Sequence, residues 1–248
     1  MVFDGSELLR FAIASIRQNV DFISVVYQTT SYFGNTADQD LVPNVKTLEE
    51  AGMIDKLVHC EPDLKQHHKV NELNWRNIGL QLSRDAGCTH HISADVDEFY
   101  KPVELEYAKK CMEDGYDYSI VPYEYYYKDP RYLIVPCQNL ITSFIHTVDN
   151  EYEMNTTFPH NVETTRHLKE YKNCKLFHQN EFIVHHMSYV RKDIRRKLCN
   201  SDNGRFYKKL NDFVARFDKY QLGDRVCIAP DFLNRKTVLV ENLFNITL

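Results

Sequence analysis

The stretch THHISADVDEFY, from Thr89 to Tyr100, decides the fold that this sequence predicts. Its residues His91 to Ala94 have β character and lead into Asp95 and Asp97. Strand side chains alternate between two faces, so we expect both carboxylates to point the same way at the end of a strand. Two neighbouring carboxylates repel each other unless a cation lies between them. A divalent ion shared between protein carboxylates and substrate phosphates fits this arrangement, so the stretch predicts a metal site.

Helical and strand patterns alternate along the chain before this stretch. Asp4 as N-cap, with Glu7 three residues later, forms a capping box that predicts the first helix. Gly87 predicts the end of a long helix. The predicted elements here are helices over 4–19, 44–53 and 68–86, and strands over 22–27 and 56–60. On the long helix, the residues that we expect to share one apolar face are Trp75, Ile78 and Leu82.

The alternation continues after Asp97 and then becomes irregular. A helix over 103–114 and a strand over 118–123 are predicted first; residues 125–180 mix aromatic residues, Pro, Asn and His, as loops around a binding site do. A strand over 182–190 and two basic amphipathic helices follow. The second helix has an apolar stripe made of Phe206, Leu210, Phe213 and Phe217.

This order of elements predicts a single α/β domain over 1–248, with a mostly parallel open sheet flanked by helices. Its parts are 1–125, 126–190 and a helical C-terminal extension over 191–248. In an open sheet of this kind the ligand lies beyond the carboxyl ends of the strands. Asp95 and Asp97 are expected at that edge.

Composition narrows the class of protein. The 248 residues are 43% apolar with a formal charge of −5, which is typical of a globular chain and gives no sign of a nucleic-acid partner. Seven cysteines are scattered without a CxxC spacing, so we expect reduced thiols and a cytoplasmic location. The sequence shows no signal peptide and no apolar run long enough to be a transmembrane segment.

Several segments together resemble the GT-A glycosyltransferases, in particular the family 2-like enzymes. These segments are FDGSELLRFAIASI, VDFISVVYQTTS, LNWRNIGL, ISADVDEF and the later His185-His186-Met-Ser-Tyr. The likeness covers roughly the first 125 residues and, beyond them, the histidine segment. It implies a Rossmann-like GT-A fold and transfer of a sugar from a UDP- or GDP-type nucleoside diphosphate donor to a hydroxyl of a glycan or lipid-linked acceptor.

The resemblance also implies roles for individual residues. Asp97 would bind Mn²⁺ or Mg²⁺ directly, Asp95 would bind the ribose or the ion through water, and His186 would complete the metal site, with His185 as the alternative. The residues expected around the donor are Phe3, Gln28, Asn74, Arg76 and Asp95.

The chain departs from the family pattern at two places. Only Met1 to Phe3 precede Asp4, so the first strand must be very short or its start is missing. Gln28 follows the second strand, where a carboxylate that binds the nucleotide base is usual, so the identity of the base stays open.

If the reaction inverts configuration, a carboxylate must take the proton of the acceptor hydroxyl. We favour Glu181, which precedes the histidine strand, and Asp149 in the irregular segment. The tyrosines of 123–127 would suit stacking against an acceptor sugar, and packing in the core explains them equally well. The remaining candidates for the base are Glu124, Asp129 and Glu151.

Other functions are also compatible with parts of the pattern. A sugar-nucleotide nucleotidylyltransferase would show a Gly-rich basic loop near the N-terminus, which this chain lacks. A phosphatase with a nucleophilic DxD would carry that motif on its first strand. A catalytically inactive GT-A-like module that binds glycans or nucleotides would have lost a metal ligand. The basic stretch Arg191–Lys197 would suit peripheral contact with an anionic membrane, but a solvated basic face is favoured.

Overall fold

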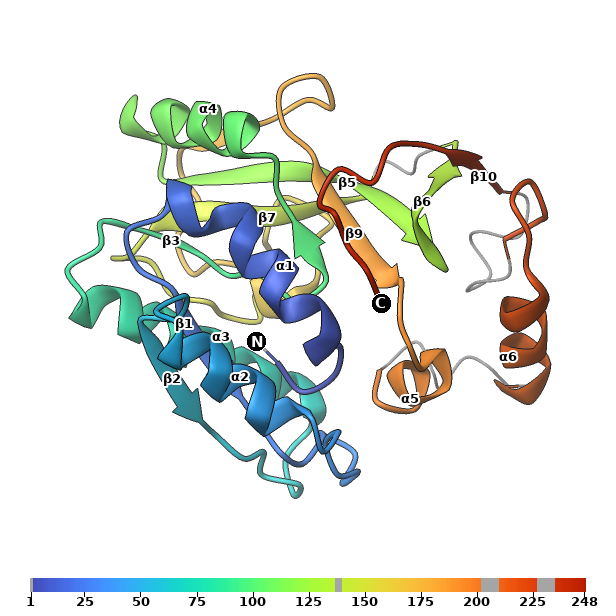
Figure 1. Ribbon diagram of the computed structural model, residues 1–248. Helices are drawn as coiled ribbons and strands as arrows, with labels where there is room; N and C mark the ends of the chain where they lie inside the picture. Colours follow the sequence, from blue (N-terminus) through green and yellow to red (C-terminus); the bar gives the residue numbers. More distant parts are fainter. Residues whose placement is uncertain (1, 137–139, 202–209, 227–234) are drawn as a thin grey trace.

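The computed structural model of the chain is a mixed α/β structure (Figure 1). It describes residues 2–136, 140–201, 210–226 and 235–248. A small parallel sheet lies beside a larger, mostly antiparallel one. The expectation of an α/β fold is therefore confirmed, and the expectation of a mostly parallel sheet is wrong.

The helices and strands follow one another in an order close to the predicted one. The helices are α1 (Ser6–Ile16), α2 (Leu41–Glu50), α3 (His68–Asp85), α4 (Pro102–Glu113), α5 (Ile194–Cys199) and α6 (Leu210–Lys219), with short 3₁₀ turns η1 (Arg17–Asn19) and η2 (Thr164–Arg166). The strands are β1 (Ser24–Tyr27), β2 (Lys56–His59), β3 (His90–Ile92), β4 (Glu98–Phe99), β5 (Tyr118–Tyr127), β6 (Asp129–Val135), β7 (Ile141–Thr147), β8 (Cys174–Leu176), β9 (Val184–Tyr189) and β10 (Lys236–Leu239).

The parallel sheet is built by the N-terminal part of the chain. β1 and β2 pair in register with Ser24 opposite Lys56. Val2 adds a single parallel bridge to Tyr27, and its amide N donates to Val26 O at 3.0 Å. This bridge is an isolated contact and not a full strand.

The larger sheet is organised around β5. β5 pairs antiparallel with β6 and β7 and parallel with β8 and β9, and β3 joins through an antiparallel pairing with β7. No helix lies between β5, β6 and β7 in the described residues, and β6 follows β5 after the single residue Lys128 at φ 69. Strands joined so directly must run antiparallel, because a parallel pair needs a long crossover. The sequence pattern of alternating helices does not extend to this part of the chain.

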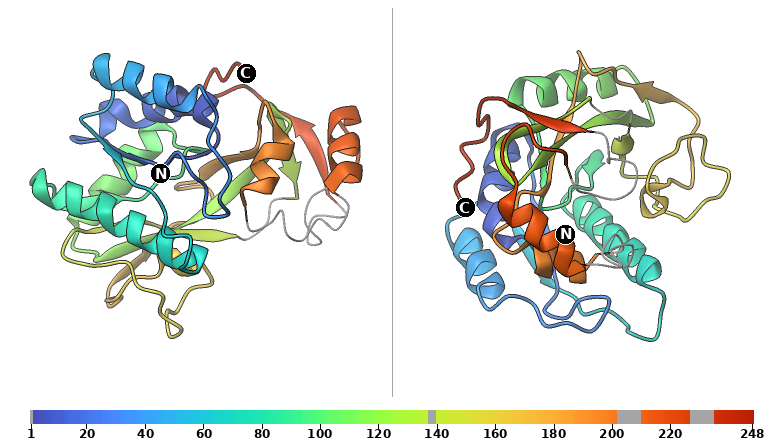
Figure 2. Two further views of the ribbon diagram at one scale, coloured as in Figure 1. Left: turned by 90° about the horizontal axis from the view of Figure 1, so that it is seen from below. Right: turned by 90° about the vertical axis from the view of Figure 1, so that its right-hand side faces the viewer.

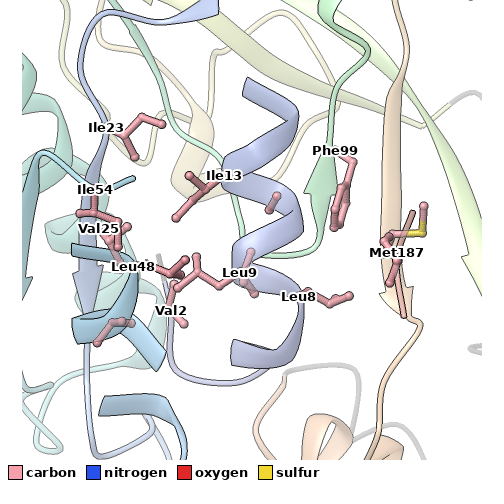
Figure 3. Packing of buried hydrophobic residues seen from close by; sticks show 14 of the residues in the cluster. Val2, Leu8, Leu9, Ile13, Ile23, Val25, Leu48, Ile54, Phe99 and Met187 are labelled. Carbon is pink, nitrogen blue, oxygen red and sulfur yellow. The ribbon is translucent and has the colours of Figure 1, made fainter. Parts of the chain in front are cut away.

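Helix α1 joins the two sheets through the main core. Figure 3 shows Leu8, Leu9 and Ile13 of α1 between residues of the β1–α2 side and residues of the β4–β9 side. Phe99 and Met187 belong to the latter side and are 0% and 1% exposed. Leu8, Leu9, Ala12 and Ile13 form the buried face of α1.

The ends of α1 and α3 can be compared with the predicted capping. Gly5, at φ 78, is the N-cap of α1, and among the described residues Asp4 accepts a hydrogen bond from the Gly5 amide alone, so the predicted capping box is wrong. Glu7 instead accepts from the Lys192 amide at 3.3 Å. The end of α3 is confirmed, since Gly87 follows it at φ 78.

The buried face of α3 differs in part from the predicted one. Trp75 is buried as expected, but Ile78 and Leu82 are half-buried. The polar residues Asn71, Arg76 and Ser83 share the buried face with Trp75 and Leu80. A scan for apolar periodicity misses such residues because they are buried by hydrogen bonds and ion pairs.

The C-terminal extension is not only helical. β10 pairs antiparallel with β6, and α5 and α6 pack beside the β6–β9 end of the sheet (Figure 2). Phe213 and Phe217 of α6 are buried as predicted, Leu210 is half-buried, and Phe206 lies outside the described residues. Within the described part of the chain, no helix has the length and apolar character needed to cross a membrane.

Candidate functional site

A cleft of about 480 Å³ lies at the carboxyl ends of β1 and β3. Gln28 directly follows β1, and Asp95 and Asp97 follow β3; all three line the cleft. Phe3 and His186, two more of the residues predicted for the site, also line it. The structure therefore brings these five residues together at one edge of the fold, although the larger sheet is antiparallel.

The Asp pair lies in a turn and not on a strand. β3 ends at Ile92, and the Glu98 amide donates to Asp95 O at 3.0 Å, which closes a turn around Val96. Strand alternation therefore does not explain why both carboxylates face the cleft. The turn holds them there, while β4 begins directly after Asp97.

Asp97 lies between a cation and a histidine. Its Oδ2 accepts from Arg191 Nη2 at 2.6 Å, and its Oδ1 lies 3.4 Å from His186 Nε2. Burial raises the pKa of Asp97, but His186 and Arg191 together hold it well below the usual value for a carboxyl group. Gly5 makes room for this arrangement, because a Cβ there would lie 3.2 Å from the Arg191 guanidinium.

The pairing of β4 with β9 determines which histidine faces the cleft. Glu98 lies opposite His186, and Phe99 opposite His185. His186 lines the cleft, whereas His185 is 1% exposed and its Nδ1 lies 2.8 Å from Tyr126 Oη. Burial lowers the pKa of His185 to about 3, so this ring is neutral at pH 7. Of the two predicted histidines, the structure brings only His186 to the Asp pair.

Asp95 is held by two arginines beneath the cleft. Its Oδ1 lies 3.4 Å from Arg76 Nη1, and its Oδ2 lies 3.0 Å from Arg166 Nη2. Burial raises the pKa of Asp95, but these two guanidinium groups lower it well below the usual value. Arg76 was predicted to reach the donor; its side chain is 0% exposed, so it acts on the cleft through Asp95.

The two arginines belong to a buried network of charges. Arg166 Nη2 donates to Glu98 Oε1 at 2.6 Å, and the same carboxylate accepts from Tyr123 and Tyr100. Arg76 donates to Glu72 at 2.9 Å. A buried charge is stable only when it is paired and hydrogen-bonded, and each of these groups is. The network fixes the turn that carries Asp95.

Aromatic side chains form one wall of the cleft. Tyr32 and Trp75 lie 5.0 Å apart between ring centroids, and Phe33 and His68 lie 5.6 Å apart. All four rings line the cleft. A flat nucleobase could stack on such a wall, because base–aromatic stacking needs no particular base.

Gln28 adds a polar group to the same cleft. Its side chain is 1% exposed, and its Oε1 has no hydrogen-bond partner in the part of the chain that the structure describes. An unpaired buried amide oxygen is costly, and a ligand that donates a hydrogen bond would satisfy it.

Besides His185, three of the predicted residues lie away from the cleft. Asn74 is on the exposed face of α3. Asp149 follows β7, and since β7 is antiparallel to β3 with Thr147 opposite His90, it lies at the end of the sheet opposite to Asp95. Glu181 is bound by the His178 amide at 2.8 Å, by Lys175 and by Tyr107 of α4, and does not line the cleft.

The other carboxylates considered as bases have structural partners. Glu124 lies 3.4 Å from His185 behind the sheet, Asp129 binds Arg131 at 2.7 Å, and Glu151 binds Lys169 at 3.5 Å. The tyrosines of 123–127 pack mainly in the core: three of them are less than 10% exposed, namely Tyr123, Tyr126 and Tyr127.

The cleft also contains residues that sequence reasoning missed. Glu72, Glu163 and Lys69 line its wall, and Lys69 bridges the two glutamates. Burial raises the pKa of Glu163, but Arg76 and Lys69 lower it to about 2. Lys197 of α5 lines the cleft as well. Glu163 lies in an irregular segment without periodicity, so no local signal could have identified it.

The basic stretch at the start of the C-terminal extension is mostly turned inward. Arg191 is buried against Asp97, and Arg196 donates to Thr36 O at 2.7 Å. Among the five cations of Arg191–Lys197, only Lys192 and Arg195 are exposed.

Few of the described protein groups in the cleft are placed to bind a metal ion. Within the described residues, no group of three or more His, Cys, Asp or Glu side chains is placed to hold an ion. Asp97 Oδ1 and His186 Nε2 nevertheless face each other at 3.4 Å on the cleft wall, a spacing that suits two ligands of one ion with bonds of about 2.0–2.2 Å. Magnesium-like ions are often bound by one or two protein groups together with water and phosphate oxygens.

Searches against protein-family models, curated proteins and solved structures found no match to this chain.

Proposed function

We propose that this chain is a GT-A-type glycosyltransferase that moves a sugar from a UDP- or GDP-type donor to a hydroxyl of a glycan or lipid-linked acceptor, with Mn²⁺ or Mg²⁺ as cofactor. The observation that carries the proposal is the meeting of Asp95, Asp97 and His186 in one cleft. These residues come from distant segments, and the cleft lies where strands β1 and β3 end.

The shape and lining of the cleft support a nucleotide ligand. Its volume of about 480 Å³ lies within the usual range for a small-molecule site. Tyr32 and Phe33, the half-buried rings of the aromatic wall, suit stacking with a base. Gln28 Oε1, which has no hydrogen-bond partner among the described residues, suits a hydrogen-bond donor on that base.

Asp97 and His186 are the groups that would hold the ion. When bound, the ion would stabilise the negative charge that develops on the leaving diphosphate. The protein's own part is to keep these ligands in place: Arg191 holds Asp97 through Oδ2, which leaves Oδ1 directed at His186. Arg76 and Arg166 hold Asp95 in its ionised form beside them.

The base for the acceptor hydroxyl is better sought on the cleft wall than at Glu181 or Asp149. In the part of the chain that the structure describes, the carboxylates that line the cleft besides the Asp pair are Asp4, Glu72 and Glu163. Glu163 belongs to the segment predicted to face the acceptor, and its side chain is 35% exposed, so an acceptor hydroxyl can reach it. Its pairing with Lys69 and Arg76 keeps it ionised at neutral pH and at the same time makes it a weaker base than a free carboxylate.

Thermal unfolding with a panel of nucleoside diphosphates and nucleotide sugars, with and without Mn²⁺, tests the proposal. A ligand at a hundred times its dissociation constant adds about 2.7 kcal/mol to the free energy of unfolding, which gives a clear shift. We expect stabilisation by one type of nucleotide that depends on Mn²⁺. The absence of a shift with every nucleotide would contradict the proposal. Hydrolysis of the donor in the same samples separates an active enzyme from an inactive binding module.

A further inference from the structure

We propose that Lys197, on the C-terminal extension, binds the diphosphate of the ligand in this cleft. The inference rests on the proposed function and adds an anion-binding residue to it. It assigns the extension a direct part in the site, beyond packing against the sheet.

The cations in the cleft differ in whether a carboxylate is paired with them. Among the described residues, the lysines and arginine that line the cleft are Lys69, Lys197 and Arg191. Lys69 is paired with Glu72 and Glu163, and Arg191 is paired with Asp97. Across the described residues, Lys197 alone of these three has no carboxylate within ion-pair distance.

Partial burial of the Lys197 side chain also favours an anionic ligand. Its side chain is half-buried, and burial lowers its pKa although Asp97 and Asp4 favour the charged form. A cation that loses water without gaining a protein partner destabilises the empty protein. An anion in the cleft would supply the missing partner, and phosphate oxygens are strong acceptors for an ammonium group.

The position of Lys197 in the cleft also supports the proposal. Lys197 and His186 line the same cleft as Asp97, while Gln28 and the aromatic wall line it too. A nucleoside diphosphate whose base contacts Gln28 would extend its charged part toward Asp97 and the extension. Asn200 and Ser201, which follow α5, line the cleft beside Lys197 and present further polar groups. A diphosphate is therefore the favoured anion, since its charge suits a site with an unpaired cation next to a candidate metal ligand.

The experiment compares Lys197→Met with Lys192→Met in the full chain. Lys192 lies close by in the sequence, is exposed, and does not line the cleft, so its replacement removes the same charge outside the site. Binding of UDP, GDP, the corresponding nucleosides and inorganic pyrophosphate is measured by calorimetry, with and without Mn²⁺. We expect Lys197→Met to weaken binding of the preferred diphosphate and of pyrophosphate about tenfold or more, and to leave nucleoside binding unchanged. Lys192→Met should bind all of them as the unmodified protein does.

The outcomes separate the inference from the proposed function. If the unmodified protein binds a nucleoside diphosphate and Lys197→Met binds it equally well, the inference is overturned and the proposed function stands. If only pyrophosphate binds, and Lys197→Met abolishes that binding, the anion site is supported and the nucleotide reading fails. If no probe binds, both are overturned. Thermal unfolding of each variant without ligand shows whether it is folded. Should Lys197→Met fold poorly, Lys197→Arg takes its place in the test: it keeps the charge and should retain most of the diphosphate binding.

Discussion

Asp97 Oδ1 and His186 Nε2 lie 3.4 Å apart, and the antiparallel pairing of β4 with β9 brings them together. Glu98, the residue after Asp97, is directly opposite His186 in that pairing. A register shift of one residue would turn His186 away and bring His185 to the cleft. The pairing of these two short strands therefore determines which histidine can take part in the site.

Replacing each histidine by glutamine tests this assignment. His186→Gln should lose most of the Mn²⁺-dependent stabilisation by nucleotide, because it removes an imidazole beside Asp97. His185→Gln is the matched control, since it makes the same change on the buried face. It should lower the free energy of unfolding without changing the Mn²⁺ dependence. The measurement is the shift in Tm with nucleotide, with and without Mn²⁺. Equal effects of the two replacements would contradict the assignment.

The parts of this site that the sequence could predict are those with a local pattern. Asp95 and Asp97 follow a short β run, and Gln28 follows an apolar strand, so their place at the strand ends could be inferred. The two histidines His185 and His186 point to opposite faces, as strand alternation predicts, because β9 is a regular strand.

The remaining parts depend on contacts between distant segments. Arg166 reaches Asp95 and Glu98 from a 3₁₀ turn, and Lys197 reaches the cleft from α5. Neither residue stands in a pattern that differs from an ordinary surface cation. The antiparallel sheet was missed for a related reason: side-chain periodicity along β5 reports that it is a buried strand, but not the direction of its neighbours.

Arg166 should be among the most important residues for stability. Arg166→Met leaves Glu98 buried at 2% exposure without its cation. Breaking a buried ion pair on one side costs about 3–5 kcal/mol, so we expect a loss of this size in urea unfolding. Arg131→Met is the control, because its pair with Asp129 is exposed and contributes about 0–1 kcal/mol. In the double variant Arg166→Met/Glu98→Gln, part of the loss should be recovered. A loss for Arg166→Met as small as for Arg131→Met would show that Glu98 is not held as described.

Asp149 and Glu181 were predicted as candidates for the general base, but both lie away from the cleft. Asp149→Asn and Glu181→Gln should leave the turnover of donor and acceptor nearly unchanged, since neither residue lines the cleft. Loss of a general base lowers the rate by about 10²–10⁴. Glu163→Gln, on the cleft wall, should lower it far more than either. A large loss of turnover in Asp149→Asn or Glu181→Gln, in a protein of normal stability, would restore that residue as the base.

The buried histidine His146 should make the protein sensitive to mild acid. Burial lowers its pKa to about 4, whereas an unfolded histidine titrates near 6.5. Between these values the unfolded chain binds a proton that the folded protein does not, so stability is complete above about pH 6.5 and falls toward pH 4. When the pH is lowered from 7 to 5, the free energy of unfolding of His146→Gln should therefore fall by about 2 kcal/mol less than that of the unmodified protein. Urea unfolding at both pH values measures this difference, and the other buried histidines contribute to both proteins alike. Identical losses would mean that His146 titrates normally in the folded protein.

Gln28 should limit stability and support binding at the same time. Its Oε1 is buried and, among the described residues, has no hydrogen-bond partner, so Gln28→Leu removes an unsatisfied polar group of the empty protein. We expect the free energy of unfolding without ligand to stay the same or to rise. The affinity for the nucleoside diphosphate should fall about tenfold, or about 1.4 kcal/mol, because a hydrogen bond to the base is lost. The affinity for pyrophosphate should not change, since pyrophosphate has no base. Calorimetry with both ligands and urea unfolding measure these quantities. A stabilised variant with weaker nucleotide binding would indicate that the unpaired oxygen serves the ligand. A variant that is destabilised and binds the nucleotide normally would place Gln28 in the core instead.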